Sequence, residues 1–537
     1  MPTSNSEITT ISPYLKEFFS KYQGYLAAEK APPEVLIRIH VDEIASKIAT
    51  FYERLRNIVD YREEHLLRKG AIERILKRRI LLRWKDPNIA ETLIKEIIRA
   101  GHLPNDVIPE TKIKEVQKII DKYIFLFDQL ETSREPDRNE IFQWLMCIGA
   151  CEIEEKLDPP FKDNILANLM FQVLNERLII QGGEVPENIK SLQLFINIQR
   201  ALLRVDNDQL NYRLIKFLYP DWADLPLENS IQIIQNLSSL KNEIQDHIDH
   251  PLGPFFFRLC NRYNTIFYLI GDIVYKSQNF EEMAANFSTV EQFEKAIKAA
   301  YQKRYQKEKG KLGRLSFYSV TSFFLTKIAV AIGIEIPLDK YLVQHFSWLN
   351  IIISIVFPPL LMLIIVSSIR MPSAKNLKLV LEESEAAVFS DKSKNYVLKI
   401  PPKKFWLTQL VVNLFYLIMF IVSFGILTWI LLKLDFSIAS VIIFLLFTSL
   451  VAMTGVKAYN RSRELSLEEE KSTILTFLID LFAMPLVTVG KWAAYGLSKF
   501  NIIIIALDLA IELPLQVFVV FLENFRGFIK GKKDEIY

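Results

Sequence analysis

The sequence has few of the residues on which many enzymes and secreted proteins depend. It contains 17 glycines and 3 cysteines in 537 residues. Scarce glycine disfavours the Gly-rich α/β nucleotide-binding folds, and three cysteines form no disulfide framework, which agrees with a reducing compartment. The sequence also lacks five common motifs. They are the phosphate-binding GxxxxGK followed by Ser or Thr, the dinucleotide-binding GxGxxG, the zinc-binding HExxH, a CxxC pair and the GxSxG nucleophile elbow. We therefore expect no cofactor, and an enzymatic activity is not the leading hypothesis.

A cleaved signal peptide is not expected either. The first 20 residues lack a basic start followed by an apolar core. Residues 1–314 should therefore remain in the cytoplasm.

Two long uncharged runs organise the C-terminal half of the chain. The first extends from Trp406 to Leu432 and the second from Phe436 to Val456. Each run exceeds the roughly 20 apolar residues that a helix needs to cross about 30 Å of hydrocarbon. Because a backbone in lipid must satisfy its own hydrogen bonds, the two runs predict a transmembrane helical hairpin.

Two further apolar runs precede this hairpin, at 315–334 and 346–369. The first carries Lys327 near its middle. The second carries Pro358 and Pro359, where we expect a kink. The sequence thus predicts four membrane spans.

The charges of the connecting loops predict the orientation. Lys and Arg concentrate in 303–314, 370–404 and 457–471, whereas 335–345 and the hairpin turn have one Lys each. By the positive-inside rule, the first three segments face the cytoplasm and the two short turns face outward. We therefore expect a multi-pass protein of the cytoplasmic (inner) membrane, with its N-terminus and its C-terminus in the cytoplasm.

The segment 472–523 allows two placements. Its two apolar stretches carry polar residues at steps of three, four and seven, on one helical face. If the stretches span the membrane, Asp480, Asp508 and Glu512 lie at membrane depth, where ionisable groups are costly and usually functional. If the stretches lie in the interface, as an internal proline in each favours, the acids face water.

These patterns predict an all-α fold, in which a large cytoplasmic helical domain precedes a transmembrane helical region with four spans, or six if 472–523 also crosses. The expected parts are a helical domain (1–314), two transmembrane helices (315–370), a cytoplasmic loop (371–404), a transmembrane hairpin (405–456), a second cytoplasmic loop (457–471), the amphipathic pair (472–523) and a basic cytoplasmic tail (524–537). In the first loop, KLVLEE and YVLKI alternate between apolar and polar residues, which predicts a small β-hairpin.

The segment from Arg68 to Lys85 combines apolar and basic residues at helical spacing. It could be the solvated face of an ordinary helix, dock on anionic lipid headgroups or bind nucleic acid. Nucleic acid is the least expected partner, because the rest of the domain is acidic. The membrane-surface candidates are Arg68, Lys69, Arg74, Lys77, Arg78, Arg79 and Arg83.

A cluster at one helix end is the best metal-binding candidate. His247 and His250 stand three residues apart, each beside a carboxylate, Asp246 or Asp249. Such groups could form half of a metal or acid–base site. The alternative is an ordinary polar helix end, where the helix dipole favours His.

Two other clusters have simpler structural interpretations. Cys147 and Cys151 stand four apart, but no second pair of ligands lies near them in the sequence, so buried core thiols are expected rather than structural zinc. Asp206 and Asp208 resemble the paired acids of metal-dependent sugar-nucleotide transferases only as a three-residue string. The expected role of this string is a helix cap.

Four segments carry a resemblance to a known group of proteins. They are EEHLLRKGAIERILKRR (63–79), IEIPLD (334–339), FPPLLM (357–362) and KFNIIIIALDLAIELPLQVFVVFLE (499–523). In these segments the chain resembles a family of uncharacterised polytopic membrane proteins from small-genome uncultured bacteria. The resemblance implies a bacterial cytoplasmic membrane, and it implies no activity and no catalytic residue.

Three functions remain as hypotheses. The leading one is a scaffold or assembly factor that binds a protein partner through its cytoplasmic helical domain. The alternative is a transporter or channel component that uses the ionisable residues of apolar segments, which are Lys327, Asp480, Asp508 and Glu512. The third is a metal-dependent enzyme that acts at the membrane face through the histidine cluster.

Overall fold

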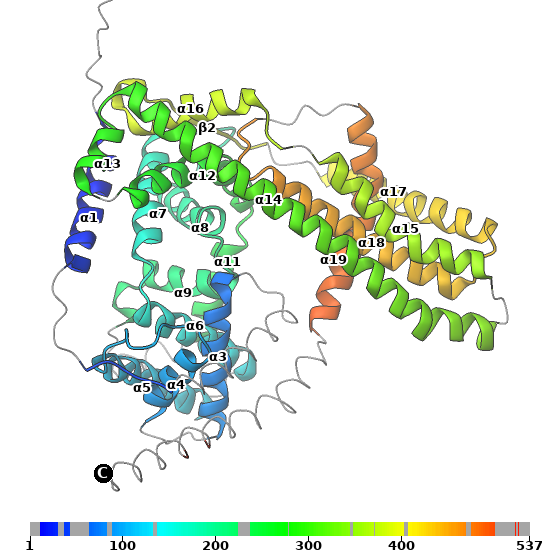
Figure 1. Cartoon of the computed structure of the whole chain (residues 1–537), viewed down its shortest axis with the longest axis horizontal. Coiled ribbons are helices and arrows are strands. Elements are labelled where there is room, and N and C mark those ends of the chain that lie inside the picture. The colour runs from blue at the N-terminus through cyan, green and yellow to red at the C-terminus, as the bar shows by residue number, and fades with distance from the viewer. Residues whose placement is uncertain are drawn as a thin grey trace, which may run out of the picture. The chain divides into compact units, whose positions relative to one another are not determined.

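A computed structural model of the chain describes residues 11–30, 37–42, 64–82, 88–132, 137–223, 237–277, 279–343, 347–369, 371–401, 406–468, 474–499, 521 and 525. These residues are almost entirely helical, with four long apolar helices in the C-terminal half (Figure 1). The all-α prediction is therefore confirmed. The described residues divide into two compact units, which we call the helical unit (16–176 and 185–260, with 521 and 525) and the membrane unit (11–15, 177–184 and 261–499).

The helical unit is built around one hydrophobic core. Its elements are α3 (Glu64–Leu82), α4 (Ile89–Arg99), α5 (Thr111–Thr132), α6 (Arg138–Leu157), α7 (Phe161–Arg177), α8 (Glu187–Ala201), α9 (Asn207–Leu218), the 3-10 turn η1 (Pro220–Trp222) and α11 (Leu237–Ile248), while α1 (Pro13–Lys30) and α12 (Gly253–Lys276) cross its boundary. Helix α6 packs against α3, α5, α9 and α11. It is therefore the central helix of the core.

A buried ion pair links α5 to α6 inside this core. The ammonium of Lys122 lies 2.6 and 2.9 Å from the two carboxylate oxygens of Glu152 and donates a third hydrogen bond, of 3.0 Å, to the carbonyl of Trp222. The hydroxyl of Tyr123 donates to Glu152 at 2.7 Å. Burial and the charge of Glu152 raise the pKa of Tyr123 well above its usual range, so the hydroxyl keeps its proton.

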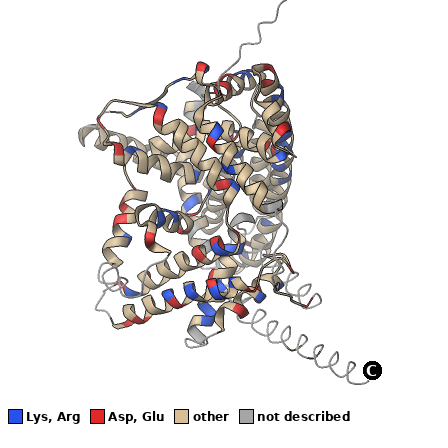
Figure 2. Cartoon of the chain, turned by 90° about the vertical axis from the view of Figure 1, so that its left-hand side faces the viewer, with Lys and Arg blue, Asp and Glu red and all other residues tan. Residues whose placement is uncertain are grey.

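Charges of both signs are mixed on the surface of the helices. In Figure 2, Lys and Arg lie among Asp and Glu on the helices in the lower part of the view.

The membrane unit contains the long apolar helices. Its elements are β1 (Leu178–Gln181), α13 (Phe280–Asn286), α14 (Val290–Val330), the π-helical segments η2 (Ala331–Glu335) and η3 (Leu338–Val343), α15 (Trp348–Ser368), α16 (Ala374–Val388), the 3-10 turn η4 (Ser390–Lys392), β2 (Tyr396–Lys399), α17 (Trp406–Lys433), α18 (Ile438–Ser462) and α19 (Ile474–Lys499). Four of its helical stretches, Val290–Tyr341, Trp348–Ser368, Trp406–Lys433 and Ile438–Ser462, are long and apolar enough to cross a membrane. They correspond to the four predicted spans.

The first of these stretches extends much further than its apolar run. Helix α14 starts at the cap residue Thr289 and passes through residue 314, which the sequence analysis placed at a domain boundary. Between 303 and 314 the chain has Gly310 and Gly313 but no proline, and a helix tolerates isolated glycines at a cost of about 1 kcal/mol each. Residues 261–314 accordingly belong to the membrane unit.

The predicted β-hairpin in 371–404 is wrong. The segment KLVLEE lies within α16, which starts after Ser373, whose hydroxyl accepts a hydrogen bond from the backbone N–H of Lys375. Asn376, Val380 and Ser384 are buried at four-residue spacing, as one face of a helix requires. The segment YVLKI instead supplies β2, which pairs in parallel with β1.

Helix α19 packs on α17 and α18. The hydroxyl of Ser423 on α17 donates to the carbonyl of Phe482 at 3.1 Å, and the hydroxyls of Tyr416 and Thr488 lie 2.9 Å apart. On the other side, Gly490 lies so close to α18 that a Cβ atom at this position would stand 2.1 Å from the carbonyl oxygen of Ser449.

The close approach at Gly490 gives a first testable prediction. The change Gly490→Ala should destabilise the membrane unit by about 2 kcal/mol, because backbone atoms cannot yield to the added methyl group. Its matched control is Gly496→Ala on the same helix, where an added Cβ meets no atom within 4 Å. Thermal unfolding of both variants in detergent measures the difference, and equal melting temperatures would contradict this packing.

Candidate functional site

A buried ion pair lies inside the apolar part of the membrane unit. The ammonium of Lys327, near the end of α14, pairs with the carboxylate of Glu335, the last residue of η2. Lys327 is 0% exposed and Glu335 is 1% exposed. The ammonium also lies 4.8 Å from the ring centroid of Phe447 on α18, so an aromatic face lies near its charge.

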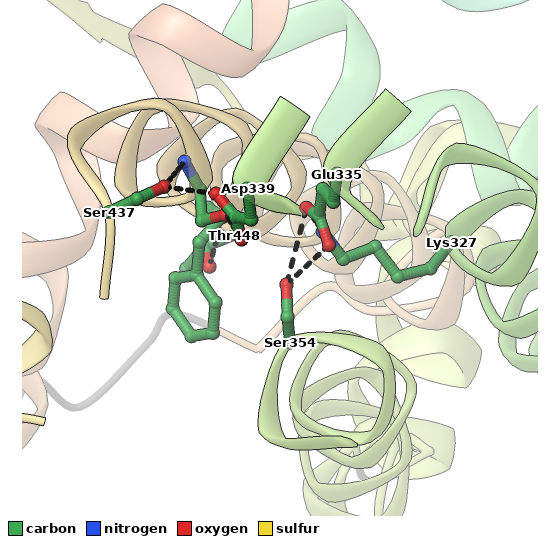
Figure 3. Close-up of polar contacts among 8 residues, drawn as sticks. Lys327, Glu335, Asp339, Ser354, Ser437 and Thr448 are labelled. Atoms are coloured by element: carbon green, nitrogen blue, oxygen red, sulfur yellow. Dashed lines mark hydrogen bonds and ion pairs between the residues drawn. The ribbon is translucent and has the colours of Figure 1, made fainter. Parts of the chain in front are cut away.

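A serine from a second helix completes this pair. The hydroxyl of Ser354 on α15 lies 3.3 and 3.2 Å from the two carboxylate oxygens of Glu335 (Figure 3). Helices α14, α15 and α18 pack against one another around the pair. The backbone between Lys327 and Glu335 passes into η2, and π-helical turns inside α-helices are frequent at functional sites.

A second buried carboxylate lies one helical turn further along the chain. Asp339 of η3 is 4% exposed and accepts hydrogen bonds from the hydroxyls of Ser437, at 2.5 Å, and Ser440, at 2.8 Å. Ser437 is the N-cap of α18. Asp339 therefore lies at the positive end of the α18 dipole, which stabilises its negative charge (Figure 3).

One member of this site could be identified from the sequence. The apolar run predicted from the sequence contains Lys327, whereas Glu335 and Asp339 were expected in an outward-facing turn and instead lie in π-helical segments. The available signal was spacing: Glu335 and Asp339 are four residues apart, so a helix that continues past residue 334 places both on one face. Asp480 is exposed on α19, and Asp508 and Glu512 lie outside the described residues.

The histidine cluster has partners of its own in the helical unit. The imidazole of His247 lies 3.9 Å from Glu243, and His250 accepts a hydrogen bond from the backbone N–H of Leu252. The carboxylate of Asp249 accepts a hydrogen bond from Gln245. Burial and the neighbouring His247 lower the pKa of His250. A metal site formed by these histidines with Asp246 and Asp249 remains a prediction.

Within the described ranges, a group with the spacing of metal ligands lies elsewhere. Donor atoms of Glu73, Cys147 and Asp208 are all within 4.8 Å of one another. Burial raises the pKa of the Cys147 thiol far above its usual range, and the thiol donates to Glu73 at 3.5 Å. Because the thiolate is the form that binds metals, this protonated thiol is poorly suited as a ligand.

A buried cation lies beside this group. The ammonium of Lys69 lies 2.7 Å from Asp206 and 2.6 Å from Asp208, and the side chain is only 1% exposed. Lys69 therefore already neutralises much of the local negative charge. Asp206 is the N-cap of α9, accepting from the backbone N–H of Gln209 at 2.8 Å, which confirms the capping interpretation. Cys151 is buried, as expected, whereas Cys147 is only partly buried.

Most cations of the basic helix α3 also have partners within the helical unit. Arg68 pairs with Glu154 and Asp158. Arg78 and Arg79 both pair with Glu96. Lys77 donates to Gln143, Arg74 is not without an interaction, and Arg83 lies outside the described residues. The cations that α3 would need for docking on anionic lipid are therefore largely paired with carboxylates of the same unit. Docking of α3 on a membrane surface remains a prediction.

Among the described residues, Lys327 and Glu335 thus form the most deeply buried ion pair, and this pair lies among apolar helices. Comparison with other proteins gives no further information about this pair, because no family model, no curated protein and no solved structure matches the chain.

Proposed function

We propose that the chain is a multi-pass membrane protein that moves protons across the membrane, with Glu335 as the group that takes and releases the proton and Lys327 as its counter-ion. The observation that carries the proposal is the burial of this pair among apolar helices. Ionisable groups at membrane depth are costly, and they usually mark an ion or proton pathway. Packing alone is the competing role of the pair, and proton flux separates the two roles.

The chemistry of the pair favours a proton over a metal cation. A metal ion near Glu335 would meet the fixed positive charge of Lys327, and both carboxylate oxygens already have hydrogen-bonding partners. A proton needs no coordination shell. When it adds to a carboxylate oxygen of Glu335, the ion pair is lost and the neutral acid retains its contact with Ser354; when it leaves, the pair forms again.

Hydroxyl groups and a second acid extend this site along the bundle. Asp339 follows Glu335 by one turn, and it is held by Ser437 and Ser440 of α18. Hydroxyls can both donate and accept hydrogen bonds, so they suit a proton relay. Under the positive-inside rule, the end of the bundle that carries Asp339 faces outward, and the helical unit lies in the cytoplasm.

Proton flux into proteoliposomes tests the proposal. Full-length protein is reconstituted with a pH-sensitive dye inside the vesicles, and a potassium diffusion potential drives the flux. We expect Glu335→Gln to lower the rate at least about tenfold, because the amide cannot exchange the proton. Asp480→Asn, at an exposed acid, should leave it unchanged.

Three outcomes would contradict the proposal that protons move through Glu335. They are a wild-type rate equal to that of protein-free vesicles, an unchanged rate in Glu335→Gln, or a flux that follows a sodium gradient and ignores the proton gradient.

A scaffold role of the helical unit is the second candidate. The unit has a hydrophobic core of its own, and its buried charges are paired internally, as in a domain that presents a formed surface to a partner. Cross-linking of the full-length protein in native membranes tests this role. A reproducible protein partner attached to the helical unit would support it, and its absence would count against it. The resemblance to uncharacterised polytopic bacterial proteins supports the membrane location alone.

A further inference from the structure

The helical unit contains a pocket of about 370 Å³ between α7, α8 and α9. Three aromatic side chains, Phe171, Phe195 and Phe217, line it. The rings of Phe195 and Phe217 are stacked, with their centroids 4.4 Å apart. A pocket of this size and apolar lining is within the range that encloses small ligands.

A smaller cavity of about 150 Å³ adjoins this pocket. The two share Glu155, Pro160 and Arg213 as lining residues. The smaller cavity is more polar than the larger one, and Gln209 is among the residues that line it. The side-chain oxygen of Gln209 is buried without a hydrogen-bond partner in the described part of the chain. Such an oxygen is a vacant acceptor for a ligand N–H group.

Arg213 lies where the two cavities meet. Its guanidinium makes one hydrogen bond within the described residues, of 2.5 Å, to the side-chain oxygen of Gln199. Burial lowers the pKa of Arg213, but a guanidinium remains charged at neutral pH. Because a guanidinium has five N–H donors, Arg213 retains donors that match a carboxylate.

The two cavities differ in charge. The larger one is lined by two cations, Arg213 and Lys216, and one carboxylate, Glu155, which gives a net charge of +1. The smaller one is lined by two cations against four carboxylates, a net charge of −2; the charged residues are Arg68, Arg213, Glu154, Glu155, Asp158 and Asp163. The joint pocket is therefore dipolar, with an apolar side next to its positive part.

We propose that this pocket binds a free α-amino acid with a large apolar or aromatic side chain. The carboxylate of the ligand pairs with Arg213, its ammonium faces the acidic cavity and the oxygen of Gln209, and its side chain lies among the three phenylalanines. An α-amino acid joins one anion, one cation and one apolar group at a single carbon, which matches the three environments that meet at Arg213. The inference does not depend on proton movement by the membrane unit.

Binding of a ligand series to the full-length protein in detergent tests this proposal by calorimetry. We expect L-phenylalanine to bind, and phenethylamine and 3-phenylpropionate, which each lack one charged group, to bind at least about tenfold more weakly. If neither L-phenylalanine nor L-leucine binds at concentrations up to about 10 mM, the proposal is wrong. Equal affinity of L-phenylalanine and either analogue would also overturn it, because recognition would then not require a zwitterion.

Two variants and one control locate the site. Arg213→Gln should weaken binding of L-phenylalanine at least about tenfold, and Phe217→Ala, at a side chain that is 44% exposed, should weaken it without affecting folding. Lys156→Gln removes a nearby cation that pairs with Glu115 outside the pocket. It should leave the affinity unchanged. If all three variants bind like the wild type, the ligand does not occupy this pocket.

Discussion

The change Lys327→Met is expected to destabilise the membrane unit by about 3–5 kcal/mol, because it leaves the carboxylate of Glu335 buried without its counter-charge. Glu335 is 1% exposed and keeps only the hydroxyl of Ser354 as a partner in the described structure. A shift of the unfolding midpoint in mixed detergent micelles, followed by tryptophan fluorescence, measures this effect.

The matched control is Lys340→Met. Lys340 lies on the same continuous helical stretch, but its side chain is exposed. Its loss should change the midpoint little. If Lys327→Met and Lys340→Met have the same midpoint, Lys327 is not held by a buried charge as described.

The double change Lys327→Met with Glu335→Leu should recover most of the lost stability. Replacing both members of a buried ion pair by apolar residues of similar size is often neutral or even stabilising. The hydroxyl of Ser354 can then turn to a backbone carbonyl of its own helix. A double variant as unstable as the single one would contradict the view that an unpaired charge causes the loss.

The second large effect is expected in the core of the helical unit. Glu152→Leu should cost about 3–5 kcal/mol, because it leaves the buried ammonium of Lys122 without an anion and removes the acceptor of Tyr123. Trp222 reports on this event, since its indole N–H donates to the hydroxyl of Tyr123 at 3.3 Å. Urea unfolding of the full-length protein, followed by fluorescence, measures the change.

Its control is Glu91→Leu on α4. Glu91 pairs with Lys95 at the surface, four residues along the same helix. Such exposed pairs contribute about 0.3–0.5 kcal/mol. Equal unfolding midpoints for the two variants would show that the pair of Lys122 and Glu152 is not buried as described.

The four long apolar helices could be predicted from the sequence because their signal is local. A run of about 20 uncharged residues has few alternatives to a membrane helix. The same applies to the cap at Asp206 and to the buried thiol of Cys151, which depend on near neighbours along the chain.

The partners of Lys327 could not be predicted in the same way. Charged residues at the end of an apolar run usually mark a loop, so Glu335 and Asp339 suggested a turn. Their burial depends on hydroxyls from Ser354 and Ser437, which are 19 and 98 residues away from them in the sequence. Likewise, alternating residues in KLVLEE suggested a strand, but burial of one face of α16 determined the outcome.

Proton flux through the double variant, Lys327→Met with Glu335→Leu, tests the central claim most directly. This variant should be close to the wild type in stability, so a loss of flux would not reflect unfolding. If Glu335 takes and releases the proton, the folded double variant reconstituted in vesicles should show no flux above that of protein-free vesicles. A flux equal to that of the wild type would mean that the pair serves only the packing of α14, α15 and α18.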